Sequence, residues 1–408
     1  MEEYIRHGTA AFRRSNLALF AAGVATFSLL YCVQPLLPEF SRYFGVSAAA
    51  SALSLSSTSA VLAVGILFAG ALSDLWGRKA VMSVSLISSA ILVLLSAIVP
   101  GWRSLLVLRT LLGCSLSGVP AVAMTYLSEE MHPDSIGLAM GLFIGGSAIG
   151  GMGGRLIAGV LADYCGWRIG VAAVGLTGLA AGVVFMRSLP PTRHFVSHPM
   201  HLRALIGRYA NPLRDPGLRW LIVEGFLLLG AFVTIYNYIG YRLMAPPYRL
   251  SQTAVGLIFS VYLVGTFSSA WIGHLAGRLG RRRVLWTMFA LMLAGVGMTL
   301  ASALWVIIAG VAVITFGFFG GHSVASSWVG RRAGAAKAQA SSMYLFSYYL
   351  GSSVAGAAGG LFYAARGWTG VAAFVAALWG AGLAIAWRLY HLAPLPGAPS
   401  AETEPPLP

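Results

Sequence analysis

Charged residues are scarce in this sequence of 408 residues, at 10% of the chain against roughly a quarter of an ordinary soluble domain. Apolar residues make up 58%, which excludes a soluble fold, because a soluble chain of this length needs far more polar surface. The apolar residues fall in stretches of about twenty, long enough to cross the hydrocarbon core of a bilayer as helices. The sequence therefore predicts an integral membrane protein.

Cysteine and catalytic motifs are also scarce. Cys32 and Cys114 fall inside apolar stretches and Cys165 follows one, so neither a disulfide framework nor a metal site is predicted. The chain has no Gly-rich phosphate loop, no G-x-S-x-G, no H-E-x-x-H and no C-x-x-C. We therefore predict that it is not an enzyme, that it needs no cofactor or metal, and that it is not driven by ATP.

Twelve apolar stretches are bounded by Gly/Pro breaks or charge clusters. Their approximate bounds are 15–38, 49–72, 80–99, 104–127, 137–161, 168–188, 219–242, 252–275, 284–303, 304–328, 338–364 and 367–389. Stretches of this length are too long and continuous for barrel strands. The fold class predicted is all-α, with twelve transmembrane helices.

The net charge of +15 is explained by topology rather than by nucleic-acid binding. An even number of spans places both termini on one side, and most Lys and Arg residues fall in the termini and loops of that side. The loops of the opposite side hold Arg42, Arg103, Arg168, Arg242, Arg249 and Arg366. The positive-inside rule then predicts cytoplasmic termini.

The chain repeats at about half its length. The loop 70–79, which reads Gly-x-Leu-Ser-Asp-Leu-Trp-Gly-Arg-Lys, returns as 273–282, and Gly166-Trp167 returns as Gly367-Trp368. A parallel repeat of six plus six helices is common in secondary transporters, which bind solute near the midplane between the halves. We expect pseudo-symmetric six-helix bundles at 1–188 and 219–390, a cytoplasmic linker at 189–218 and a disordered tail at 391–408.

The loop 70–79 is the most informative motif. Gly70 and Gly77 permit a tight turn between two helices, and Asp74, Arg78 and Lys79 supply opposite charges at the membrane edge. Such charges can pair with each other or with helix ends. We predict a latch that holds one conformation and releases another; the alternative is a simple loop anchor.

These residues resemble the major facilitator superfamily, whose signature between helices two and three is G-x-L-a-D-r-x-G-r-k. Arg109 with Gly113 looks like its fourth-helix R-x-x-x-G signature. The fifth stretch, with Gly146, Gly150 and Gly154, resembles the motif of its drug:proton antiporters, except that Gly151 replaces Pro and Arg155 replaces the last Gly. The second loop has Gly277 where the signature has Asp, which predicts a weaker latch there.

Several segments look more narrowly like the YnfM-type transporters of bacterial inner membranes. They are Leu30–Pro35, Tyr126–Glu130, Asn237–Tyr241 and Tyr344–Tyr349. This resemblance implies a multi-pass protein of the bacterial inner membrane and leaves the solute open, because members of the group carry very different cargoes.

Two arginines lie inside predicted spans. Counted along their helices, Arg109 and Arg155 lie at a similar depth, roughly 9–12 Å from the outer surface. A buried arginine is costly unless it meets water or a partner. The pair predicts an anion-attracting patch; the alternative is that each binds backbone carbonyls, Glu39 or Asp163. In the resembling antiporters the fourth-helix arginine is tied to proton coupling.

Glu224 and His322 are the candidate coupling residues of the second half. Glu224 lies about five residues inside its span, and burial disfavours the charged form of a carboxyl group, so it is a candidate proton carrier. A cap or gate contact is the alternative. His322 is able to titrate near neutral pH or to serve in packing.

Polar and aromatic residues mark the expected cavity. In the fold that this resemblance implies, spans one, four, seven and ten line the cavity, and spans two, five, eight and eleven contribute to it. Aromatic side chains with a few polar groups suit a small organic ligand. The predicted cavity residues are Tyr31, Gln34, Tyr236, Asn237, Tyr241, Ser323, Tyr344, Ser347 and Tyr348. We expect the glycines of the fifth and eleventh spans to serve helix packing.

The function predicted is secondary-active transport of a small organic solute by alternating access, as proton-coupled efflux. Its partners are the bilayer, the solute and protons, with no nucleic acid, and its energy source is the proton gradient. Nothing requires more than a monomer. The alternative is a facilitator or importer of a small organic anion. A membrane enzyme would need a reactive cluster in the spans, and a receptor is not expected to repeat at half its length.

Overall fold

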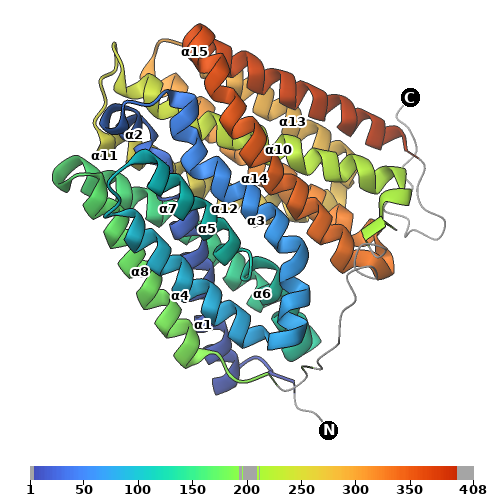
Figure 1. Cartoon of the computed structure of the whole chain (residues 1–408). Helices are drawn as coiled ribbons and strands as arrows, with labels where there is room; N and C mark the ends of the chain where they lie inside the picture. The colour runs from blue at the N-terminus through green and yellow to red at the C-terminus, as the bar shows by residue number, and fades with distance from the viewer. Residues whose placement is uncertain (1–3, 193–194, 196–208, 211, 393–408) are drawn as a thin grey trace. The chain divides into compact units, whose positions relative to one another are not determined.

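The computed structural model describes residues 4–192, 195, 209–210 and 212–392. The predicted tail lies almost wholly outside these residues, as does most of the predicted linker. Helices make up the described structure, apart from one isolated bridge between Ile5 and Met131. The elements in chain order are α1 Ala10–Tyr31, η1 Gln34–Leu36, α2 Leu37–Phe44, α3 Ala48–Trp76, α4 Arg78–Ser96, α5 Trp102–Leu116, α6 Pro120–Glu130, α7 Pro133–Cys165, α8 Trp167–Ser188, η2 Pro212–Arg214, α10 Pro216–Met244, α11 Gln252–Ile258, η3 Phe259–Val261, α12 Tyr262–Leu279, α13 Arg281–Met298, α14 Leu304–Arg332, η4 Gly334–Ala336 and α15 Lys337–His391 (Figure 1).

The described helices account for the twelve predicted spans. When consecutive elements are joined, as in Ala10–Phe44, Trp102–Glu130 and Gln252–Leu279, ten helices are long and apolar enough to cross a membrane. One of the ten, α15, contains non-helical backbone at Arg366 and Gly367, so it provides two spans. The 18 residues of α13 begin with three arginines and form the remaining span. The predicted break near Ala303 is confirmed, because Ala303 is the N-cap of α14.

The chain divides into two compact units. Unit 1 contains Met1–His201 together with Leu243–Ser260, and unit 2 contains Leu202–Arg242 together with Val261–Pro408. The units follow the two sequence halves except for 243–260, which includes α11 and groups with unit 1. There α11 packs against α7.

In unit 1, α7 lies directly on the backbone of α1. A Cβ added at Gly146, Gly150 or Gly154 would come within 2.5, 2.2 and 2.6 Å of Phe20 O, Val24 O and Ser28 Cα, respectively. The glycines are four residues apart, so they line one face of α7. Small residues at this spacing let two membrane helices approach closely, which confirms the packing role expected for the fifth span.

Unit 2 repeats this packing between α15 and α10. A Cβ at Gly351 would lie 2.1 Å from Phe226 O, and one at Gly359 would lie 2.5 Å from Thr234 Cγ2. Gly351 and Phe226 follow Gly150 and Val24 by about half the chain length. The structure therefore extends the repeat from loop motifs to helix packing.

The first span is interrupted after Tyr31, a feature that was not predicted from the sequence. After α1 ends at Tyr31, the chain forms the short 3-10 helix η1, which contains Pro35, and continues as α2 to Phe44. Because Pro35 has no amide proton, it cannot continue the hydrogen-bond ladder of α1. The last carbonyl groups of α1 therefore need other donors.

Candidate functional site

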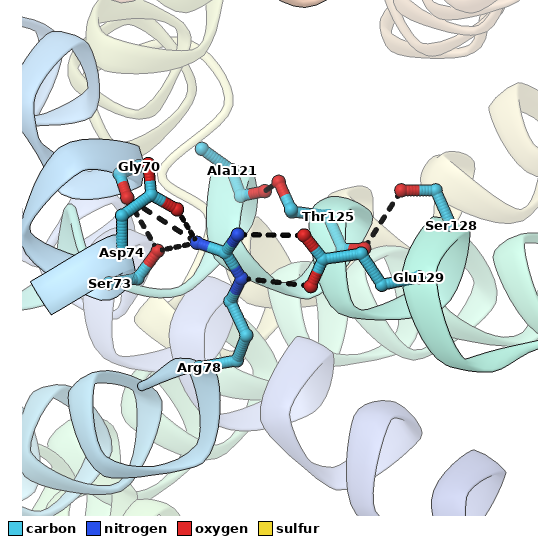
Figure 2. A network of polar contacts seen from close by, with 8 residues as sticks. All are labelled: Gly70, Ser73, Asp74, Arg78, Ala121, Thr125, Ser128 and Glu129. Carbon is cyan, nitrogen blue, oxygen red and sulfur yellow. Dashed lines mark hydrogen bonds and ion pairs between the residues drawn. The ribbon is translucent and has the colours of Figure 1, made fainter. Parts of the chain in front are cut away.

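The loop between α3 and α4 forms a compact charge network centred on Arg78, as Figure 2 shows. Its Nη1 lies 2.5 Å from Asp74 Oδ1 and 2.5 Å from Ser73 Oγ. On the opposite side, Nε and Nη2 donate to both carboxylate oxygens of Glu129, at 3.0 and 2.7 Å. Glu129 belongs to α6, so this bidentate pair ties α6 to the loop. The Arg78 side chain is only 6% exposed, and such charge-assisted bonds are strong and directional.

The remaining predicted latch residues have separate roles. The carbonyl of Gly70 accepts from Ser73 Oγ at 2.7 Å. Gly77 lies between α3 and α4 with φ 88°, a conformation that favours glycine. Lys79 points elsewhere and donates to the carbonyl of Leu189, just after α8, at 2.5 Å.

Arg109 is buried and binds backbone. Its guanidinium donates to Leu29 O at 3.1 Å, Leu30 O at 2.6 Å and Ser54 O at 2.9 Å. Leu29 and Leu30 are in the last turn of α1, whose negative dipole end attracts a cation. Arg109 therefore caps the broken first span, which is the carbonyl-binding alternative noted from the sequence.

Arg155, on α7, contacts the residues that follow α1 at the same break. It donates from Nε to Gln34 Oε1 at 2.7 Å and from Nη1 to Gly151 O at 2.6 Å. Its guanidinium also stacks 4.2 Å from the ring of Tyr31 and 5.0 Å from that of Phe259. The structure thus brings together three predicted residues, Tyr31, Gln34 and Arg155, beside Arg109.

The two acids named from the sequence as possible partners of the arginines have other contacts. Glu39 pairs with Arg42. Asp163 Oδ2 accepts from the amide of Thr253 at 3.2 Å, at the start of α11. Next to this contact Gln252 donates to Pro35 O. These bonds fasten α11 to α7 and η1 within unit 1.

In unit 2, Glu224 on α10 is fully buried. Neither of its carboxylate oxygens has a hydrogen-bond partner among the described residues. The ring of Tyr344 packs over the adjacent Gly225, where a Cβ would lie 2.9 Å from Tyr344 Cε2. The Tyr344 hydroxyl in turn lies 2.9 Å from His322 Nδ1. A buried acid, a phenol and an imidazole therefore follow one another across α10, α15 and α14.

An aromatic stack extends from His322. Its ring lies 4.5 Å from that of Tyr348 at 29° and 6.2 Å from that of Phe318 at 9°. Phe318 in turn stacks on Phe232 at 3.7 Å and 8°. The two stacks of His322 fall within the range of centroid distances at which aromatic rings attract one another beyond their buried area.

Of the other predicted cavity residues, Tyr236 joins this stack, because its ring lies 4.9 Å from that of Phe232. The hydroxyl of Tyr236 bonds to that of Thr315 at 2.7 Å, and Tyr241 stacks near Tyr238 and Tyr363. Asn237 and Ser347 are buried. Ser323 faces α12, where a Cβ at Gly273 would lie 3.1 Å from its Oγ.

Two ionic contacts were not predicted from the sequence. Glu129 was noted only as part of a family-like segment, although its position at the end of a span beside basic loops is a usable signal. The second contact joins Asp215 to Arg332, with distances of 2.6 and 3.1 Å. Burial raises the pKa of Asp215, but hydrogen bonds from Arg332 and from the amides of Leu218 and Gly217 hold that pKa below its usual value.

Comparison with known proteins identifies the class. Helices in two repeated units, with buried charged residues inside the spans, define a secondary membrane transporter. The model of the Major Facilitator Superfamily matches residues 19–250 and 225–408, and the chain belongs to this family.

Its relatives include transport proteins of similar length. The chain is 51% identical to "Inner membrane transport protein YnfM" of Escherichia coli K12, over 95% of this chain and 93% of that protein. It is 49% identical to "Uncharacterized MFS-type transporter YybF" of Bacillus subtilis 168, over 91% and 92%. The predicted resemblance is confirmed, and the chain is a multi-pass transporter of the inner membrane.

Solved structures show the same fold. A bacterial homolog of the human lysosomal transporter Spinster, in an inward-facing and unoccupied conformation, has a TM-score of 0.75 at 14% identity, covering 93% of this chain and 95% of its own. A mutant of the nucleoside transporter NupG has a TM-score of 0.73 at 15% identity, covering 92% and 98%.

Proposed function

We propose that this transporter exports a small organic solute in exchange for protons, and that Glu224 carries the proton. The buried carboxyl group of Glu224, with no hydrogen-bond partner for either oxygen among the described residues, carries this proposal. A bare carboxylate inside a membrane protein is strongly disfavoured. Glu224 therefore binds a proton in this arrangement and becomes ionised only when water or a solute reaches it.

Tyr344 and His322 support the proposal by their position. The Tyr344 hydroxyl and His322 Nδ1 are 2.9 Å apart, within the range for proton transfer. Tyr344 lies beside Glu224 through its contact with Gly225. In the proposed mechanism these two side chains pass the proton between Glu224 and water, while Tyr348 and Ser347 contribute to the solute path.

The loop 70–79 serves as the conformational latch. Arg78, the first residue of α4, binds both Asp74 on α3 and Glu129 on α6. A movement of α6 away from α4 therefore breaks the bidentate contact with Glu129. We place this loop and both termini at the cytoplasmic face, from the distribution of Lys and Arg, and expect a monomer to be sufficient.

Energised inverted membrane vesicles test the coupling. A chemical panel is added while a quenched dye follows the lumenal pH. We expect certain solutes to discharge the proton gradient, and vesicles lacking the protein to show no such response. Uptake of a labelled solute with no pH response would contradict proton exchange.

A second candidate function is facilitated transport or import of a small organic anion. Arg109 and Arg155 favour it, because both guanidiniums lie at the break in the first span and donate there to carbonyl and amide oxygens, which carry no formal charge. In this case Arg155→Ala weakens transport of anionic solutes far more than that of neutral ones. Equal loss for both would make Arg155 structural.

A further inference from the structure

The connection between α6 and α7 is short and extended. Met131 follows α6 with φ −89° and ψ 141°, and His132 precedes α7 with φ −60° and ψ 141°. An extended backbone turns amide and carbonyl groups sideways, away from the helices on either side. Buried backbone groups of this kind need hydrogen-bond partners from another part of the chain.

Residues 4–9, hereafter the N-terminal segment, supply these partners. Ile5 forms a parallel bridge with Met131. The amide of Ile5 donates to the carbonyl of Glu130 at 2.9 Å, and its carbonyl accepts from the amide of His132 at 3.0 Å. Glu130 is the last residue of α6, and an α-helix has no amide of its own for its last carbonyl groups. The N-terminal segment therefore completes the end of α6.

The N-terminal segment is fixed on both sides of this bridge. The amide of His7 donates to Ser135 Oγ in the first turn of α7, at 3.0 Å. Thr9 is the N-cap of α1. The side chain of Ile5 is only 8% exposed and belongs to the hydrophobic core of unit 1, so its burial stabilises the docked segment.

The end of α6 that the segment completes carries the acid of the latch. Glu129 binds Arg78 through two hydrogen bonds of 3.0 and 2.7 Å, and such a bidentate pair demands a defined position of both partners. Glu129 lies in the last turn of α6, and helix ends fray. By donating to the neighbouring carbonyl of Glu130, Ile5 opposes fraying at the position from which Glu129 reaches Arg78.

Unit 2 has an ionic counterpart of this tie. Asp215, directly before α10, binds Arg332, the last residue of α14, at 2.6 and 3.1 Å. In the repeat, α10 and α14 correspond to α1 and α6. In each unit the approach to the first helix therefore binds the end of the fourth span, by backbone pairing in unit 1 and by an ion pair in unit 2.

We propose that Ile5 is a positioning residue for the latch. The N-terminal segment holds the last turn of α6 in its helical form, and this places the Glu129 carboxylate against Arg78. When the segment leaves, the turn frays and the bidentate contact is lost. The consequence for transport rests on the latch role proposed above, whereas the positioning of Glu129 does not.

Thermal unfolding of the purified protein tests the coupling between Ile5 and Glu129. The loss of unfolding midpoint caused by Glu129→Gln is measured in the unaltered protein, in Ile5→Ala and in the control Val174→Ala. Val174 is fully buried on α8. We expect the loss to fall below about half in Ile5→Ala and to stay the same in Val174→Ala, because only coupled residues depart from additivity. Ile5→Val should restore the full loss.

Hydrogen exchange gives a second measurement. The amide of His132, which donates to Ile5 O, should exchange at least about tenfold faster in Ile5→Ala than in the unaltered protein. Ser135→Ala removes only the bond from His7 and keeps the Ile5 side chain buried. It should change both measurements in the same direction by a smaller amount, and it replaces Ile5→Ala if that variant does not fold.

Two results would overturn the positioning role. They are an equal loss from Glu129→Gln in all three backgrounds, and no loss from Glu129→Gln in the unaltered protein. Flux of one solute from the vesicle panel then separates this inference from the latch. If Ile5→Ala uncouples Glu129 and leaves flux unchanged, the latch has no role in transport but the positioning stands. If flux falls in Ile5→Ala and falls no further in Ile5→Ala with Glu129→Gln than in Glu129→Gln alone, both proposals are supported.

Discussion

In unit 1 the glycines of α7 lie against the backbone of α1, and in unit 2 those of α15 lie against α10 at equivalent positions. The buried charges of the two units differ. Unit 1 buries Arg109 and Arg155, whose donors bind carbonyl and amide oxygens. Unit 2 buries Glu224, whose oxygens bind no described residue.

This difference teaches that burial alone does not mark a functional charge. The cations of unit 1 stabilise an interrupted helix, because the last turn of α1 offers carbonyl groups to Arg109. Among the described residues no hydrogen-bond donor supports the Glu224 carboxylate, and this is the observation on which the proposed proton transfer rests. Because the glycine packing is equivalent in the two units, the effects of changing a buried charge can be compared between them.

Removing Arg109 should have the largest effect on stability. Arg109→Ala removes the charged donor of three buried carbonyl groups, of which Ser54 O keeps Thr58 Oγ1 and Leu29 O keeps Cys32 Sγ as donors. We expect a loss of about 3 to 5 kcal/mol in the free energy of unfolding. Arg109→Lys should retain only part of the stability that Arg109→Ala loses, because an ammonium group cannot reach all three carbonyl oxygens. The unfolding midpoint in detergent measures this effect, with exposed Arg103→Ala as the control. A change as small as that of the control would show that the cap is dispensable.

The glycine contacts should respond alike in both units. Gly150→Ala and Gly351→Ala each place a methyl group against backbone, and we expect a destabilisation of about 1 to 3 kcal/mol for each. Gly153 on α7 has open space around an added Cβ, so Gly153→Ala is the matched control. Thermal unfolding measures all three. If Gly150→Ala destabilised the protein and Gly351→Ala did not, or the reverse, the helix packing of the two units would not be equivalent.

The latch loops should respond unequally. Asp74→Asn or Glu129→Gln removes a partner of Arg78, and we expect flux to fall about tenfold while the protein still inserts into the membrane. Arg281→Gln in the second loop, where Gly277 replaces the acid, should change flux by less than about twofold. Solute flux per inserted protein measures the difference. Unchanged flux in Asp74→Asn would remove the latch role.

The Asp215–Arg332 pair should give the smallest effect, and one that depends on pH. Because the pKa of Asp215 is held below its usual value, the pair stabilises the fold above the ordinary carboxyl pKa and loses this contribution as the pH falls below about 4. At pH 7, Arg332→Gln should cost about 1 kcal/mol. The difference from the unaltered protein should shrink on acidification. A difference that stays constant with pH would show that the carboxylate is not involved.

Hydropathy and the repeated loops were sufficient to predict the spans, the repeat and the glycine packing, because lipid imposes length and apolarity on each helix. The break after Tyr31 was missed, although Pro35 marks it, because the apolar run continues through it. Helix rise predicts a similar depth for Arg109 and Arg155, but it gives no indication of their hydrogen-bond partners. The carbonyl groups of Leu29 and Leu30 become available because α1 ends there, and Glu129 meets Arg78 only after three helices have packed.

Proton coupling through Glu224 is tested most directly in proteoliposomes that contain the unaltered protein or Glu224→Gln. Two assays use one solute from the vesicle panel: uptake driven by a pH gradient, and exchange of labelled for unlabelled solute without a gradient. We predict that Glu224→Gln keeps the exchange and loses at least about tenfold of the gradient-driven uptake, because a glutamine preserves the shape of the side chain but carries no proton. Full gradient-driven uptake by Glu224→Gln would contradict the account.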